Sequence, residues 1–175
     1  MLTTTLLRGL RAGDGGAIRR LLSRAGNFTA AEQAVAMELV DIGLTVPDQK
    51  DYIFAVAEDD GLVVGYICWG LASMSDGTYD LYWVAVDPGC RGRGIGKMLV
   101  EHCEEKVKEA RGRSLLIETS SRAGYEGTLA FYLRLNYEVL ARLRDYYTAG
   151  DDKIVLGKYF SCQEPDRGRV AETSR

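Results

Sequence analysis

One segment restricts the fold of this chain more than any other. The apolar run YWVAV (82–86) leads within four residues into RGRGIG (91–96), which holds three glycines and two arginines. Apolar residues then recur at helical spacing, at Ile95, Met98, Leu99, Cys103, Val107 and Ala110. A strand therefore passes into an amphipathic helix through a loop that is almost bare of side chains. This junction predicts strands and helices packed in one mixed α/β domain.

The rest of the chain supports that class. Thr29 and Glu32 form a capping-box pattern at the start of a helix, and Gly26 and Gly43 are placed as helix ends. β-branched and aromatic runs alternate with these helices. The expected strands are 5–11, 51–59, 61–70, 78–87, 113–120, 137–147 and 152–160, and the expected helices are 13–26, 29–43, 94–112 and 127–136. We predict an α+β fold over residues 1–160 with a mixed, mostly antiparallel sheet flanked by helices, followed by a polar, flexible tail at 161–175.

Composition removes several classes of function. The formal net charge of the 175 residues is −3, which does not favour nucleic-acid binding. No apolar stretch approaches the roughly 18 residues of a membrane-spanning helix, and the first residues lack the pattern of a signal peptide. The four cysteines form no C-x-x-C pair and have no metal-ligand spacing. We expect a cytoplasmic protein with reduced thiols and no metal.

The glycine-rich loop itself suggests an anion site. Backbone N–H groups at the start of a helix attract phosphate, because the positive end of the helix dipole lies there. The spacing fits neither the dinucleotide fingerprint G-x-G-x-x-G nor a P-loop, which needs glycine at Arg91 and Ser or Thr at Met98. A tight turn is the simpler alternative. Arg91, Arg93 and Lys97 in the same segment favour a diphosphate.

Two motifs resemble those of the GNAT acetyltransferase superfamily. Arg91, Gly94 and Gly96 match its acyl-coenzyme A signature R/Q-x-x-G-x-G/A, and LAFYLRLNYE (129–138) is similar to its second signature A-x-x-F-Y-x-x-x-G-F. The resemblance runs from Leu6 to Tyr159 and includes some similarity to the RimI-type, ribosomal-protein alanine N-acetyltransferases. It implies the family's fold and acetyl-CoA as co-substrate.

The resemblance also implies where the cofactor lies. The pyrophosphate would rest on the backbone amides at the start of the helix, and the pantetheine arm would pair with the preceding strand. The cofactor-binding residues implied in this way are Val84, Ala85, Val86, Arg91, Gly92, Arg93, Gly94, Ile95, Gly96 and Lys97. A plain core strand is the alternative interpretation of Val84–Val86, and both can hold together.

Catalytic roles follow from the same resemblance. Tyr132 occupies the place of the family's general acid, although a tyrosine in a helix can also simply pack on the sheet. Glu118 matches a base proposed for the RimI type. Asp80 is the rival base, and a chain of waters without a single base is the third possibility. Asp80 shares a face with Tyr82 and Val84 only if no bulge interrupts the strand.

The loop between these residues departs from the RimI pattern. Ser120–Thr128 is two residues longer, and Tyr125 stands where an asparagine usually contacts pantetheine. The alternatives are that Tyr125 or Thr128 takes over that contact, or that the loop shapes the acceptor site. The aromatic residues Tyr79, Tyr82, Trp83, Tyr146 and Tyr147 either wall an acceptor pocket or form core and a homodimer contact. We expect transfer of acetyl to an amine of a small molecule or peptide. The alternative is a catalytically silent acyl-CoA-binding sensor.

Overall fold

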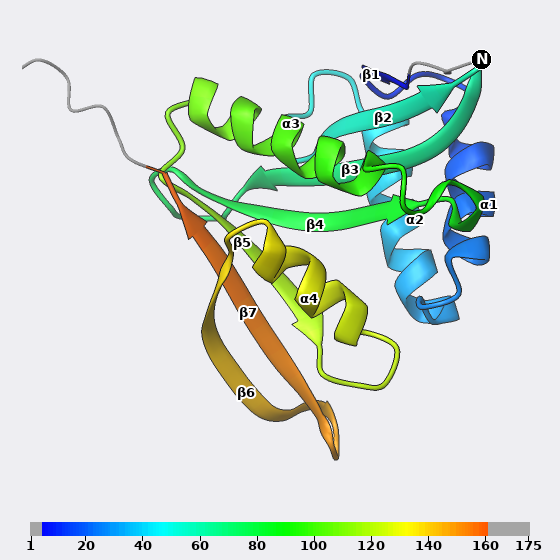
Figure 1. Cartoon of the computed structure of the whole chain (residues 1–175). Coiled ribbons are helices and arrows are strands. Elements are labelled where there is room, and N and C mark those ends of the chain that lie inside the picture. Colours follow the sequence, from blue (N-terminus) through cyan, green and yellow to red (C-terminus); the bar gives the residue numbers. More distant parts are fainter. Residues whose placement is uncertain (1–4, 161–175) are drawn as a thin grey trace, which may run out of the picture.

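The computed structural model describes residues 5–160. Figure 1 shows strands and helices that alternate along the chain in the expected order. The elements are β1 (Leu6–Arg8), α1 (Asp14–Ala25), α2 (Ala30–Thr45), β2 (Ile53–Asp59), β3 (Leu62–Leu71), β4 (Thr78–Val86), a 3₁₀ turn (Pro88–Cys90), α3 (Ile95–Glu109), β5 (Ser114–Ser120), α4 (Glu126–Arg134), β6 (Glu138–Thr148) and β7 (Asp151–Tyr159).

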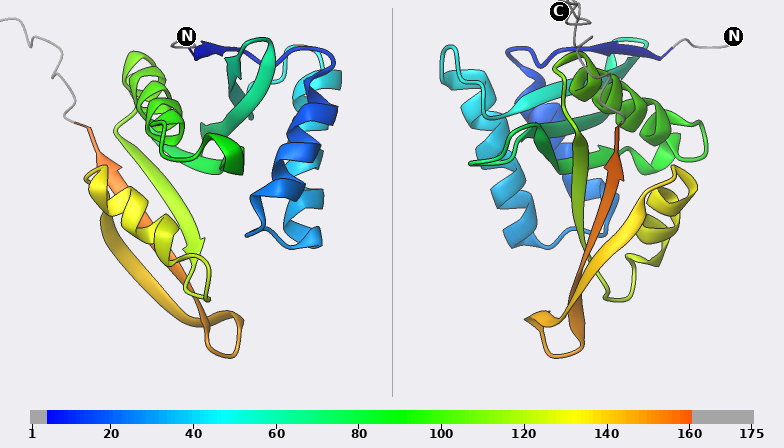
Figure 2. Two further views of the ribbon diagram at one scale, coloured as in Figure 1. Left: turned by 45° about the vertical axis from the view of Figure 1, so that its right-hand side comes forward. Right: turned by 90° about the vertical axis from the view of Figure 1, so that its left-hand side faces the viewer.

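All seven strands form one sheet in the order β1-β2-β3-β4-β5-β7-β6. Every neighbouring pair is antiparallel except β4 and β5, which run parallel. The expected mixed, mostly antiparallel sheet with flanking helices is confirmed. Helices α1 and α2 cover one face over β2–β4, and α3 and α4 lie on the opposite face (Figure 2).

The two faces of the sheet carry separate cores. Strand β3 is buried from Val64 to Gly70, because helices cover it on both sides. Its Ile67 and Trp69 pack beneath α3 in one cluster, while Tyr66 and Cys68 pack beneath α1 and α2 in the other. The first cluster also takes in β5, β7 and α4, so one core continues across the sheet on that face only.

Two helical expectations need correction. Helix α2 has the predicted capping box, but it continues through Gly43 to Thr45. A Cβ at Gly43 would lie 2.5 Å from Cε2 of Phe54, so this glycine admits the Phe54 ring and does not end the helix.

The buried stripe of α3 is also turned from the expected one. Ile95, Leu99, Cys103 and Val107 are buried as predicted, and Ala110 is exposed. Val100 and Glu104 are buried in addition. Glu104 enters the core because charged and polar partners from other elements meet it there, which no local pattern reveals.

Among residues 5–160, we find no helix whose length and apolar character would allow it to cross a membrane.

Candidate active site

The sheet opens between β4 and β5. Their parallel pairing starts at Thr78 opposite Ser114 and stops at Leu81 opposite Ile117. At the same level, β3 pairs Trp69 with Leu81 and Cys68 with Trp83, which leaves Tyr82 as an extra, bulged residue. Beyond this bulge, the described strands provide no partner for the second edge of β4. Backbone groups on that edge at Val84–Val86 therefore have no partner strand among the described residues.

The end of β4 leads into the start of α3 through two left-handed glycines. Gly92 and Gly94 each have φ of +79°, a conformation that strains other L-residues. Gly94 is the N-cap of α3, and no side chain of the described residues caps this helix. Its first-turn amides therefore lack intrahelical acceptors. A Cβ at either glycine would meet nothing within 4 Å, so the space over these amides is open.

The loop's arginines anchor it to the rest of the protein. Arg91 donates from Nη2 to the backbone oxygen of Ala25 at 2.9 Å, at the carboxyl end of α1. Arg93 pairs with Asp59 on β2, with 2.7 Å between Nη2 and Oδ2. Lys97 is mostly exposed, 3.6 Å from Glu101. The sequence groups these three cations as possible phosphate ligands, and the structure gives the two arginines a role in holding the loop.

A pocket of about 220 Å³ lies at the point where the strands separate. It is lined by Asp80, Leu81, Tyr82, Leu116 and Glu118. Both candidate bases therefore face one space, as strict alternation predicted for Asp80 and Tyr82. Val84 packs with the opposite cluster, because the bulge at Tyr82 reverses the alternation.

The two carboxylates of this pocket differ in their surroundings. Burial raises the pKa of Asp80, and the negative charge of Glu118 raises it further. Glu118 is 55% exposed and its Oε2 lies 2.6 Å from Nζ of Lys153 on β7. Hydrogen bonds from Lys153 to Glu118 and Tyr146 outweigh the burial of the ammonium group and raise the pKa of Lys153.

One aromatic ring, that of Tyr82, lines the pocket, and further rings lie beside Tyr82 and Lys153. Tyr82 packs edge-on against Tyr52 with ring centroids 5.5 Å apart. The Lys153 ammonium lies 4.1 Å from the centroid of the Tyr146 ring. Tyr146 also meets the ring of Tyr147, whose pKa is raised by burial. Of the aromatic residues in the sequence cluster, Trp83 and Tyr79 pack against the cores. A dimer contact through Tyr146 and Tyr147 stays a prediction.

Tyr132 lies on the other face of the sheet. It lies in the last turn of α4, is 2% exposed, and belongs to the cluster beneath α3. Its ring meets Phe131 at 5.0 Å and Tyr137 at 5.5 Å between centroids. Burial raises the pKa of its phenol. The predicted acid and the predicted bases therefore lie on opposite faces of the split sheet.

The longer loop before α4 reaches across to α2. Arg122 donates from Nη2 to Oε2 of Glu32 at 2.9 Å. The Tyr125 hydroxyl donates to the backbone oxygen of Asn27 at 3.1 Å. Burial and the charge of Glu32 raise the pKa of Tyr125 to about 12. Tyr125 occupies the place of the missing asparagine, but its hydroxyl is used within the protein.

The sequence analysis missed Lys153. It lies opposite Ser120 in the pairing of β5 with β7, and only that register brings it to Glu118. His102 is half-buried, with its ring edge-on to that of Trp69. Within the described residues no group of three or more His, Cys, Asp and Glu side chains is placed to hold a metal ion.

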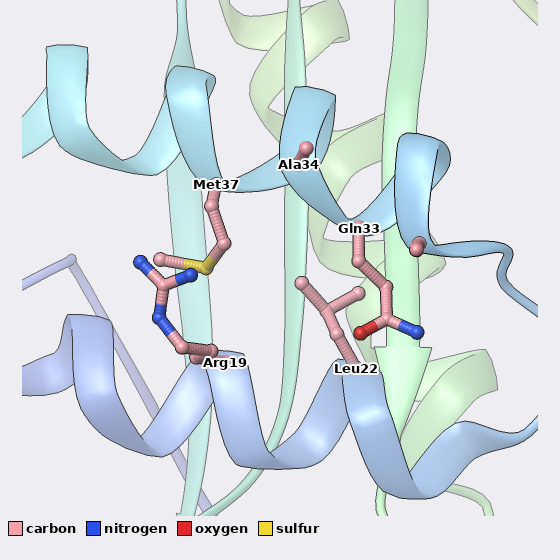
Figure 3. A pocket seen from close by; sticks show the side chains of 6 residues that line it. Arg19, Leu22, Gln33, Ala34 and Met37 are labelled. Atoms are coloured by element: carbon pink, nitrogen blue, oxygen red, sulfur yellow. The ribbon is translucent and has the colours of Figure 1, made fainter.

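A second, smaller hollow of about 180 Å³ lies between the two helices on one face. Figure 3 shows Arg19 and Leu22 of α1 facing Gln33, Ala34 and Met37 of α2. None of the predicted cofactor or catalytic residues lines it.

These features together suit one kind of ligand. An extended chain pairing with the free edge of β4 and ending in a diphosphate at α3 has the form of an acyl-coenzyme A. The chain belongs to the GNAT acetyltransferase family, since the model of the acetyltransferase (GNAT) domain matches residues 50–139.

Individual relatives agree with this membership. An uncharacterized N-acetyltransferase from Methanocaldococcus jannaschii is 35% identical over 105 residues, which are 60% of this chain and 65% of the relative. The match thus spans slightly less than two thirds of that protein's length. A crystal structure from Desulfovibrio desulfuricans, described as a GNAT-family acetyltransferase, is 36% identical, covers 89% of this chain and 99% of its own, and superimposes with a TM-score of 0.86.

More distant structures share the fold. The ribosomal-protein-S18-alanine N-acetyltransferase of Escherichia coli is 18% identical, with 93% of this chain and 99% of its own covered and a TM-score of 0.73. A Salmonella typhimurium acetyltransferase solved with its cofactor acetyl-CoA is 17% identical, with 94% and 99% covered and a TM-score of 0.70. At these identities the likeness shows the fold alone.

Proposed function

We propose that this chain transfers the acetyl group of acetyl-CoA to an amine of a small molecule or peptide. One observation carries the proposal: the uncapped, open start of α3 directly follows a strand whose second edge loses its partner at Tyr82. Family membership supports the reaction class, and the acetyl-CoA bound to the S. typhimurium protein supports the co-substrate.

The residues of the junction fit the co-substrate. The amides from Gly92 to Lys97 would hold the pyrophosphate, since the helix start has free donors and its glycines leave space. The backbone of Val84–Val86 would pair with the amides of the pantetheine arm. Arg91 and Arg93 keep the loop in place through Ala25 and Asp59.

The thioester supplies an activated acyl group, which an uncharged amine attacks directly. The new N–C bond forms as the C–S bond breaks, and two protons must move. The amine loses one to a carboxylate of the pocket, and the departing sulfur receives one from the Tyr132 hydroxyl. The split in the sheet suits this division, because the carboxylates and Tyr132 lie on its opposite faces.

Asp80 is the better supported base. The Oε2 atom of Glu118 is already engaged in an ion pair with Lys153, 2.6 Å from its Nζ. Burial and Glu118 make Asp80 a stronger acceptor by raising its pKa. The role of Glu118 predicted from the resemblance stays a prediction. Profiles of rate against pH for Asp80→Asn and Glu118→Gln distinguish the two carboxylates. Only substitution of the true base should abolish the fall in rate at low pH.

Cofactor binding is tested by two variants of one glycine. Gly94→Glu and Gly94→Lys share the strain of a side chain at φ +79°, and they differ in the charge placed over the amides. Titration calorimetry with CoA should show binding lost for Gly94→Glu and retained for Gly94→Lys. Equal affinities for the two variants would refute the phosphate site.

Turnover is tested by thiol release from acetyl-CoA with a panel of polyamines, aminoglycosides and short peptides with free amino termini. Tyr132→Phe should lower kcat at least tenfold, because a general acid usually contributes about 10²–10⁴-fold, while CoA affinity stays unchanged. CoA binding without thiol release for any amine would favour the silent sensor. A full rate in Tyr132→Phe would remove Tyr132 from the mechanism.

A further inference from the structure

A buried carboxylate on α3 takes no part in the reaction proposed above. Glu104 is 4% exposed and lies between α3 and β7. Lys158 donates from Nζ to both of its oxygens, at 2.9 and 2.8 Å, and the Tyr137 hydroxyl donates to Oε1 at 3.0 Å. We call these three residues the Glu104 cluster. Burying such charges is costly unless they are paired, and replacement by apolar residues is often no less stable.

Both partners of Glu104 also hold the end of α4. Lys158 donates from Nζ to the backbone oxygen of Leu135 at 3.0 Å, and Leu135 is the C-cap of that helix. The chain then reverses at Asn136, with φ of +63°, so that the Tyr137 amide donates to the backbone oxygen of Tyr132 at 3.1 Å. The Glu104 cluster therefore fixes the turn that carries Tyr132.

The same cluster fixes the ring beside Tyr132. The rings of Tyr132 and Tyr137 meet edge-on, with centroids 5.5 Å apart and planes at 68°. The bond from the Tyr137 hydroxyl to Glu104 holds the far end of that neighbouring ring. The Lys158 ammonium lies 5.4 Å from the centroid of the same ring. Tyr132 is thus held at its backbone and along one side of its ring.

We propose that Glu104 is a positioning residue: through Tyr137 and Lys158 it sets the place of the Tyr132 phenol relative to the opening between β4 and β5. This inference rests on the proton-donor role proposed for Tyr132. Proton transfer depends on such placement, because a displacement of about 1 Å can lower a rate roughly 10²-fold. A cluster that only stabilises the fold would leave the rate of correctly folded molecules unchanged.

A kinetic cycle tests the link to Tyr132. Tyr137→Phe keeps the ring and removes only the bond to Glu104. With the best amine of the panel, it should lower kcat roughly three- to tenfold and leave the KM for acetyl-CoA unchanged. In the Tyr132→Phe background the same substitution should have no further effect on kcat. An equal loss in both backgrounds, or no loss in either, would overturn the proposal.

A fluorine measurement tests the placement without turnover. In protein labelled with 3-fluorotyrosine, the resonance of Tyr132 is assigned by its disappearance in Tyr132→Phe. Tyr137→Phe should shift or broaden that resonance. Tyr66→Phe is the matched control, because it removes a buried hydroxyl from the other core and should leave the resonance unchanged.

The two measurements separate the possible failures. An unmoved Tyr132 resonance in Tyr137→Phe overturns the positioning role of Glu104, whatever the rates. A full rate in Tyr132→Phe alone refutes the proton donor of the proposed function. If Tyr132→Phe keeps its full rate but Tyr137→Phe moves the Tyr132 resonance, Glu104 still fixes the position of the Tyr132 ring.

Discussion

Substitution of Gly94 and of Gly96 by alanine, both at the start of α3, should change the stability of the protein in opposite directions. Gly94 has φ of +79°, and a Cβ there would touch nothing within 4 Å, so alanine meets only backbone strain. Gly96 lies inside the first turn of α3 without a positive φ. Its added Cβ would lie 3.5 Å from Cζ of Phe131 and 3.7 Å from Cγ2 of Val86, which are ordinary contacts.

The magnitudes follow from these geometries. A left-handed alanine at position 94 costs about 1–2 kcal/mol. Alanine at position 96 gains about 0.5–1 kcal/mol, because glycine loses more backbone entropy in a helix. For a chain of this length each kcal/mol shifts Tm by about 2–4 °C. Gly94→Ala should therefore melt roughly 3–12 °C below Gly96→Ala, with the unaltered protein between them.

Thermal unfolding of the protein without ligand, followed by circular dichroism, measures this gap. Gly94→Asn serves as the control, since asparagine tolerates the left-handed region and should melt above Gly94→Ala. The signature of the family accepts alanine at the position of Gly96, so Gly96→Ala should also keep its affinity for CoA. A Gly94→Ala protein as stable as the original, or a Gly96→Ala protein less stable than it, would refute the reasoning.

Three further substitutions test other parts of the structure. Because burial and Glu118 raise the pKa of Asp80, the folded state binds its proton more tightly than the unfolded state. Asp80→Asn should therefore raise the free energy of unfolding at pH 7, with no gain below pH 3.8, as urea titrations at both pH values would show. Lys158→Met leaves the buried Glu104 carboxylate without its cation and should lower that free energy by about 3 kcal/mol in the same assay; a loss below about 1 kcal/mol would contradict the buried pair. Tyr66→Phe removes a buried hydroxyl that has no hydrogen-bond partner among residues 5–160. It should raise the free energy of unfolding by about 1–3 kcal/mol, which a higher midpoint of urea unfolding would show.

Local signals predicted much of this molecule. The capping box of Thr29 and Glu32 marked the start of α2, and the glycine spacing marked the loop before α3. Contacts between segments that are distant in the sequence could not be predicted from local patterns. Glu104 lies in a charged stretch that suggests a solvated helix face, and only Lys158, 54 positions away, accounts for its burial.

The candidate site shows the same division. Sequence motifs identified Tyr132, Asp80 and Glu118, while the pairing of Glu118 with Lys153 depends on the register between β5 and β7. The tie from Arg122 to Glu32 joins residues 90 positions apart, so no local pattern shows it. Alternation along β4 predicted the shared face of Asp80 and Tyr82 and failed at Val84, after the bulge.

The absence of a helix over one face of β5, β7 and β6 within residues 5–160 has a consequence for how such a protein changes over time (Figure 2). Side chains on this face, such as Lys153 and Tyr146, are not packed beneath a helix, unlike the side chains on the opposite face beneath α4. Substitutions on this surface should change the stability of the fold little, and they lie away from the donor site proposed at α3. Under the proposed function, substitutions on this face can therefore change which amine is accepted, while the donor site proposed at α3 is left unaltered.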